Sequence, residues 1–171
     1  MADVVAVRGT PYNILLASLE ALCAGENTRL SVLSNAASLL YWSLEDVNWV
    51  GFYLQRGDAL YLGPFHGQPA CVMIPLGKGV CGAAASARKT LLVPDVEAFP
   101  GHIACDTASR SEIVVPVVDG DRLLGVLDVD SPRLERFGEQ EREFFERAVV
   151  VILDAMRKAI SEGTSPDGAW S

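Results

Sequence analysis

The stretch EIVVPVVDGDRLLGVLDVD, residues 112–130, decides the fold of this chain. Two runs rich in valine and leucine flank a polar turn at residues 119–121, which is the pattern of a β-hairpin. Asp128 and Asp130 lie two positions apart on the second strand, so their side chains point to the same face. The stretch therefore predicts an antiparallel sheet in which one strand carries two carboxyl groups on one side.

The length of that turn determines where Glu112 lies. A three-residue turn pairs residues 118 and 122 and places Glu112 directly across from Asp128, so that three carboxyl groups gather. A two-residue Asp119-Gly120 turn shifts the register and moves Glu112 to the opposite face. The sequence leaves both registers open, and a solvated strand face is the alternative interpretation of the acids. If the acids do cluster, mutual repulsion favours a protonated carboxyl group, which can donate a hydrogen bond.

Outward from this hairpin, apolar periodicity predicts an α+β domain with helices on one or both faces of an antiparallel sheet. Thr10 is expected to cap the first helix, with Pro11 at its first helical position. The expected helices cover residues 10–25, 28–43, 80–89 and 138–161, and the expected strands lie at 48–55, 59–65, 70–76, 91–96, 112–118 and 122–130.

Composition indicates a single domain. A chain of 171 residues, half of them hydrophobic, can bury a full core, which we expect over residues 10–161, with 162–171 as a flexible tail. The net charge is −8 with acids and bases interleaved, which disfavours a nucleic-acid or membrane surface and favours a small molecule or another protein as partner. The N-terminus lacks a basic region before a long apolar run, so we expect a soluble, cytoplasmic protein.

Four cysteines are present, and the ample core argues for reduced thiols rather than a disulfide framework. Cys23 fits a small buried hydrophobe at the end of the first helix. Cys105 differs, because it lies in a long Gly-Pro loop beside His102 and directly before the strand that carries Glu112. No C-x-x-C pair, phosphate-binding loop, dinucleotide-binding loop or G-x-S-x-G motif occurs, so neither a structural zinc ion nor a cofactor is expected.

Several motifs together resemble one family closely. From about residue 30 to about residue 150, the strings NWVGFYL, LGPF, VPDV, FPGHIACD, SRSEIVVP and LDVDSP follow the order and cysteine spacing of the GAF-domain free methionine-(R)-sulfoxide reductases. The resemblance implies a GAF domain, in which helices flank a central antiparallel sheet of about six strands. It also implies an enzyme that reduces free methionine-(R)-sulfoxide to methionine.

The resemblance assigns a role to three thiols. Cys105 would attack the sulfoxide sulfur and be left as a sulfenic acid, and Cys71 would resolve that acid by forming a disulfide that thioredoxin reduces. Cys81 would be auxiliary. A sulfenic acid must meet a second thiol before it is oxidised further, which explains why this chemistry needs two cysteines.

The resemblance also assigns a substrate pocket. The acids of this pocket would hold the amino group of the substrate and polarise its sulfoxide oxygen. Two aromatic side chains on one strand face would enclose the methyl group and the thioether chain. These residues are Glu112, Asp128, Asp130, Trp49 and Tyr53. The oxygen must be protonated or strongly hydrogen-bonded in the transition state, which a neutral carboxyl group can achieve.

Two other functions compete with this hypothesis. A non-catalytic GAF sensor would bind a small molecule and signal to an output domain, and a sensor would not require two cysteines beside an acidic pocket. A peptide-methionine reductase or another thiol peroxidase would need a more open site. The apolar stripes of the terminal helices also favour a homodimer.

Overall fold

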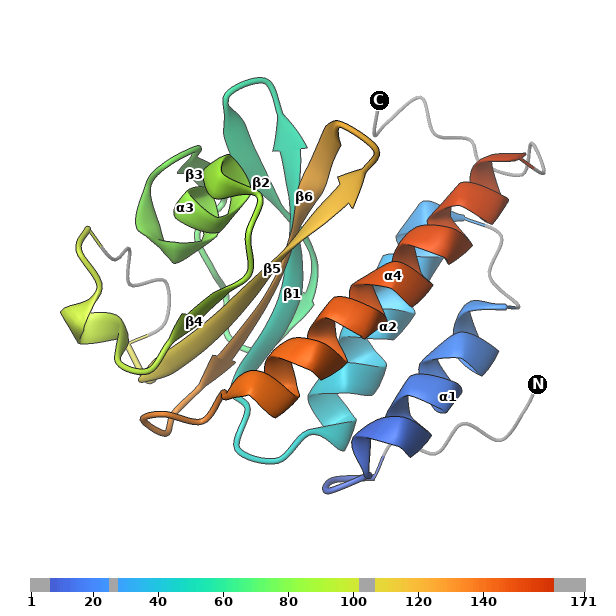
Figure 1. Cartoon of the computed structure of the whole chain (residues 1–171), viewed down its shortest axis with the longest axis horizontal. Helices are drawn as coiled ribbons and strands as arrows, with labels where there is room; N and C mark the ends of the chain where they lie inside the picture. Colours follow the sequence, from blue (N-terminus) through green and yellow to red (C-terminus); the bar gives the residue numbers. More distant parts are fainter. Residues whose placement is uncertain (1–6, 25–27, 102–106, 162–171) are drawn as a thin grey trace.

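A six-stranded antiparallel sheet with the order β3-β2-β1-β6-β5-β4 organises the protein, so the predicted α+β class is confirmed (Figure 1). The computed structural model describes residues 7–24, 28–101 and 107–161. The strands are β1 Trp49–Arg56, β2 Ala59–His66, β3 Met73–Pro75, β4 Leu91–Val93, β5 Ser111–Asp119 and β6 Arg122–Ser131. The helices are α1 Tyr12–Cys23, α2 Arg29–Ser43, α3 Gly79–Ala87 and α4 Glu139–Ser161, with a short 3-10 helix η1 at Val96–Ala98.

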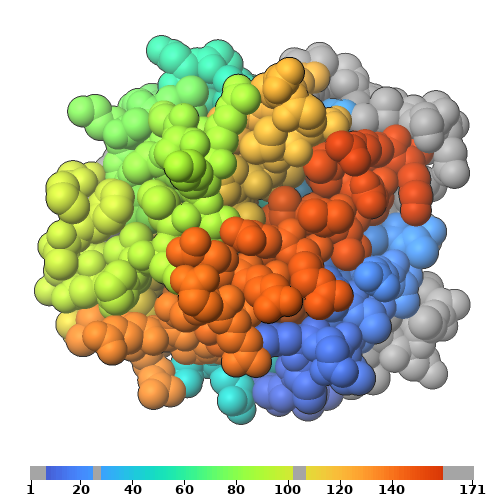
Figure 2. Space-filling model, in the orientation of Figure 1, coloured from blue at the N-terminus to red at the C-terminus, as the bar shows by residue number. Residues whose placement is uncertain are grey.

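The helices α2 and α4 cover one face of the sheet, and α1 packs against these two helices on their outer side (Figure 1). Alternate residues of the central strands point to this face, where Phe52, Ile113 and Leu127 pack against Phe145 and Ile152 of α4 in the larger of two hydrophobic cores. The outer side of α4 runs across the surface of the molecule beside α1 (Figure 2). This core therefore joins the central strands to α2 and α4, and α1 completes it from the outer side.

The opposite face of the sheet carries α3 and a smaller core. Glycine and alanine dominate α3, which lets the helix approach the sheet closely. A Cβ atom at Gly82 would overlap the backbone oxygen of Pro75, so only glycine fits at this approach. As predicted from its small residues, α3 packs tightly, and it brings Cys81 down onto β5 and β6.

The register of the β5–β6 hairpin matches neither predicted alternative in full. The turn has two residues, because Asp119 pairs with Arg122, and a β-bulge near Leu124 then adds one residue to β6. A two-residue turn alone would place Glu112 on the face opposite to Asp128. The extra residue of the bulge shifts the pairing by one position, so Glu112 and Asp128 lie on the same face. Glu112 stands across from Asp130, however, and the predicted direct pairing of Glu112 with Asp128 is wrong.

The helix ends differ in detail from the sequence predictions. Pro11 is the N-cap of α1, and the Thr10 hydroxyl donates to the carbonyl oxygen of Val7 instead of capping the helix. Thr28 does cap α2, where its side chain accepts from the backbone N–H of Ser31. Cys23 is buried at the end of α1, as expected for a small hydrophobe. Among the helices that the structure describes, none combines the length and apolarity needed for a membrane span.

Candidate active site

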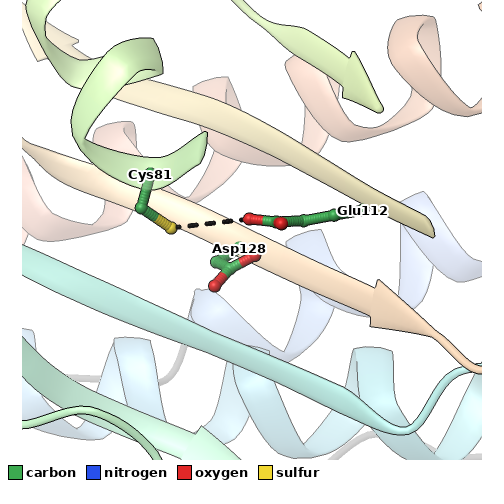
Figure 3. Close-up of side chains that lie close together, drawn as sticks. All are labelled: Cys81, Glu112 and Asp128. Carbon is green, nitrogen blue, oxygen red and sulfur yellow. Dashed lines mark hydrogen bonds between the residues drawn. The ribbon is translucent and has the colours of Figure 1, made fainter. Parts of the chain in front are cut away.

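Three elements bring a thiol and two carboxyl groups together beneath α3 (Figure 3). Cys81 is the third residue of α3, Glu112 comes from β5 and Asp128 from β6. The Cys81 Sγ donates to Glu112 Oε1 at 3.8 Å, and one ligand-type atom from each residue lies within 4.8 Å of the others. All three side chains are buried, with 4, 5 and 6% of their surface exposed.

Burial and mutual repulsion keep protons on this cluster. Burial, followed by the charges of Asp128 and Asp130, raises the pKa of Glu112 well above its usual range. Burial also raises the pKa of Asp128 to about 6. The Cys81 thiol has a pKa raised well above that of a free cysteine, because it is buried beside Asp128 and Glu112. Cys81 is therefore a protonated hydrogen-bond donor rather than a thiolate nucleophile.

The cluster also contains an acceptor without a donor. Asp128 Oδ1 is buried and has no hydrogen-bond partner among the described residues. Asp130, across from Glu112, is half-buried at the margin of the cluster. A buried carboxylate oxygen without a donor is costly, so this arrangement is suited to a ligand that brings a cation or an N–H group.

An aromatic wall stands beside the acids on the same face of the sheet. Trp49 lies across from Asp130, and its ring stacks on Tyr53 with centroids 5.9 Å apart. The indole Nε1–H donates to the carbonyl oxygen of Gln68 at 3.1 Å, which fixes the ring. Trp49 and Tyr53 therefore share one face, as the alternation of β1 predicted.

The sequence did not point to Phe65 as part of this wall. Its ring stacks on Trp49 with centroids 5.3 Å apart, and Phe65 pairs with Gly51 in the neighbouring strand. The pairing of β1 with β2 shifts by one residue between Gly51 and Tyr53. Counting alternate residues from the turn therefore places Phe65 on the wrong face of the sheet.

Cys71 lies at the edge of the same region. The Tyr53 hydroxyl donates to the carbonyl oxygen of Cys71 at 3.0 Å, which ties the thiol's backbone to the aromatic wall. Cys71 is disulfide-bonded, so the expectation of reduced thiols is wrong for this residue, whereas Cys23 and Cys81 form no disulfide. The predicted nucleophile Cys105 and its neighbour His102 lie outside the described residues.

Comparison with known proteins identifies the family. The GAF domain family matches residues 28–152 of the chain. The free methionine-R-sulfoxide reductase of Escherichia coli K12 is 47% identical over 141 residues, which cover 82% of this chain and 86% of that protein. The chain belongs to the GAF-domain free methionine-R-sulfoxide reductase family.

Two further members support the same assignment. The free methionine-R-sulfoxide reductase of Saccharomyces cerevisiae is 46% identical over 146 residues, which cover 81% of each chain. The X-ray structure of the free methionine-R-sulfoxide reductase of Neisseria meningitidis in complex with its substrate superposes with a TM-score of 0.85 at 38% identity. That alignment covers 88% of this GAF domain protein and 91% of the Neisseria chain.

Proposed function

We propose that this protein reduces free L-methionine-(R)-sulfoxide to L-methionine. The observation that carries the proposal is the buried thiol and carboxyl cluster beside an aromatic wall, in a chain whose relatives bear the name of that reductase. A small amphipathic ligand with a cationic end and a thioether chain complements both parts of this site.

The acids of the pocket bind the amino group of the substrate and activate its oxygen. Asp128 and Asp130 accept from the ammonium group, and Glu112 keeps a proton to higher pH than a free carboxyl group and donates it to the sulfoxide oxygen. Trp49 and Tyr53 enclose the methyl group and the thioether chain. A methionine sulfoxide within a peptide lacks the free ammonium group, so the acids would be left unpaired and the peptide is rejected.

The chemistry begins with Cys105. Its sulfur attacks the sulfoxide sulfur while the oxygen is protonated, and the oxygen then transfers to the cysteine, so that one thiol and one sulfoxide give one sulfenic acid and one thioether. The Cys71 thiol next attacks the sulfenic sulfur, which forms a Cys71–Cys105 disulfide and releases water. A dithiol reductant restores both thiols. The disulfide-bonded state of Cys71 and the free state of Cys81 support these assignments, with Cys81 in an auxiliary role.

We also propose thioredoxin as the reductant and a homodimer as the assembly. Thioredoxin supplies the dithiol that an exchange reaction requires. The dimer is supported by exposed apolar side chains on the terminal helices, where Ile14 of α1 and Val150 of α4 are 53 and 58% exposed. Sedimentation of the reduced protein tests the dimer, and a monomer at micromolar concentration would contradict it.

The decisive experiment measures methionine release from three substrates with thioredoxin as reductant: the free R sulfoxide, the free S sulfoxide and a peptide-bound R sulfoxide. Turnover of the free R form alone is expected. Cys105→Ser should abolish turnover, whereas Cys71→Ser should release one equivalent of methionine per site and then stop. If the folded, reduced protein turns over none of the three, a ligand-binding GAF sensor replaces this proposal.

A further inference from the structure

The buried cluster has a second chemical property besides its fit to an ammonium group. It combines one soft sulfur donor with two oxygen donors, and these come from three separate elements (Figure 3). Neither Glu112 nor Asp128 forms an ion pair with a basic side chain of the described residues. When these carboxyl groups ionise, no basic side chain in the part of the protein that the structure describes pairs with them.

We propose that Cys81, Glu112 and Asp128 bind one Zn²⁺ ion, which holds the acids of the proposed substrate site and inhibits the reductase in competition with its substrate. The metal site stands on geometry alone, and only the inhibition rests on the proposed function. The sequence predicts no such site, because the cysteine and the nearer acid are 31 residues apart and meet only through the packing of α3 on the sheet.

The donor geometry suits zinc. Zinc binds thiolate sulfur at about 2.3 Å and carboxylate oxygen at about 2.0–2.2 Å in a tetrahedral arrangement, which places neighbouring donor atoms roughly 3.3–3.6 Å apart. Cys81 Sγ and Glu112 Oε1 are already 3.8 Å apart, and the third donor lies within 4.8 Å of both. Three protein ligands leave one coordination position for water or a substrate atom.

Asp128 provides an independent reason to expect a cation. The residue is only 6% exposed. Its Oδ1 atom has no hydrogen-bond donor among the described residues. An acidic cluster on an open surface is satisfied by water, but this oxygen is shielded from it. A metal ion would satisfy the oxygen without any basic side chain.

Binding would displace protons and involve no electron transfer. Zinc takes the place of the Cys81 thiol proton and of any proton shared by the carboxyl groups, and these protons pass to solvent. The bound ion then holds the same carboxyl groups that the substrate ammonium requires. Zinc and free methionine sulfoxide therefore exclude each other.

The test is a titration with Co²⁺, whose thiolate charge-transfer absorption in the near ultraviolet reports a cysteine ligand. The oxidised protein is used, so that Cys71 is held in its disulfide and the described cysteines outside a disulfide are Cys23 and Cys81. We expect one equivalent of Co²⁺ to give the band and Zn²⁺ to displace it. Cys81→Ser should abolish the band, while the matched control Cys23→Ser, a buried thiol in the other core, should retain it.

A second variant guards against a folding defect in Cys81→Ser. Glu112→Gln keeps the thiol and the side-chain shape, so it should retain the band at saturation with affinity weakened about tenfold or more, since even outer-sphere changes cost 10–100-fold. No band in the wild-type protein, or a band that survives Cys81→Ser, overturns the proposal. A Cys81-dependent band in a protein without reductase activity supports the metal site and overturns only the proposed function.

Discussion

At the scale of single residues, the behaviour of the site follows from how deeply its acids are buried. Asp128 and Glu112 are removed from water on a sheet face whose described neighbours supply no compensating cation. The folded protein therefore tolerates their charge poorly, and both carboxyl groups keep their protons to higher pH than free carboxyl groups do. This is a cost to stability, and the proposed substrate site would use it, because that site requires both an acceptor for a cation and a donor for an oxygen.

Asp128→Asn should stabilise the protein above about pH 6. Aspartate has a pKa near 3.8 when unfolded and about 6 here, so the folded state binds more protons between these values and loses stability as pH rises through them. Asparagine does not titrate, so the variant does not lose stability in this pH range. Its free energy of unfolding relative to wild type should rise by on the order of 2–3 kcal/mol from pH 4 to pH 7, measured by urea denaturation at each pH.

Asp119→Asn is the matched control for that measurement. The Arg157 side chain lowers the pKa of Asp119, so this carboxyl group stabilises the fold when it is charged. Removing it should lower stability at neutral pH and have little effect in acid. If the stability of both variants relative to wild type changes in the same direction with pH, burial does not determine the pKa of Asp128.

Tyr53→Phe should loosen the segment that carries Cys71. The change removes the hydrogen bond from the Tyr53 hydroxyl to the Cys71 carbonyl oxygen, which should cost about 0.5–1.5 kcal/mol of stability. Disulfide formation after substrate addition should slow, as followed by thiol titration on a rapid-quench timescale. Tyr61→Phe, at a 39% exposed position on β2, should change neither quantity. An unaltered rate of disulfide formation in Tyr53→Phe would show that the tether is not needed.

At the scale of elements, a β-bulge and a small-residue helix create the site. The bulge near Leu124 turns β6 so that Glu112 and Asp128 share a face, and α3 comes close enough to add Cys81. Each feature depends on glycine where backbones approach closely. At Gly125, next to the bulge, a Cβ atom would overlap the backbone oxygen of Tyr53.

Gly125→Ala should therefore damage both stability and activity. The backbone of β1 cannot move aside as a flexible side chain would, so we expect a loss of about 1–3 kcal/mol. The distorted bulge should also misplace the acids, so that turnover of free methionine-(R)-sulfoxide falls at a temperature where the variant remains folded. Gly138→Ala is the control, because its Cβ would meet only Glu141 Oε2 at 3.6 Å. Full activity in Gly125→Ala would mean that the bulge does not position the site.

At the scale of the whole molecule, the sheet separates the larger hydrophobic core from the proposed site. The helices α1, α2 and α4 share the larger core, while the thiol, the acids and the aromatic wall lie on the other side. Stability and substrate recognition should accordingly respond to different substitutions.

Ile152→Ala tests this separation. Ile152 is fully buried between α4 and the sheet, so its truncation should cost about 2–5 kcal/mol in the free energy of unfolding. The KM for free methionine-(R)-sulfoxide should stay within about twofold of wild type, because the site lies across the sheet. Leu134→Ala, at a 48% exposed position, should leave both quantities nearly unchanged. A large KM change in Ile152→Ala would show that the helical core shapes the pocket.

Periodicity in the sequence was enough to predict the helices, the strands and the α+β class, because local alternation reports which face of each element is buried. The face shared by Trp49 and Tyr53, and that of Asp128 and Asp130, followed from the same alternation. Family resemblance then supplied the GAF fold, which is confirmed, and the roles that we propose for the thiols.

The tertiary structure alone decided which of these faces meet. The register of Glu112 depended on a bulge that adds one residue, and counting residues along a strand cannot detect such an insertion. Cys81 joins the acids, and Phe65 joins the aromatic wall, through contacts between elements distant in the chain. Local sequence determines how each element folds, whereas long-range packing determines which side chains share the water-poor space where their chemistry changes.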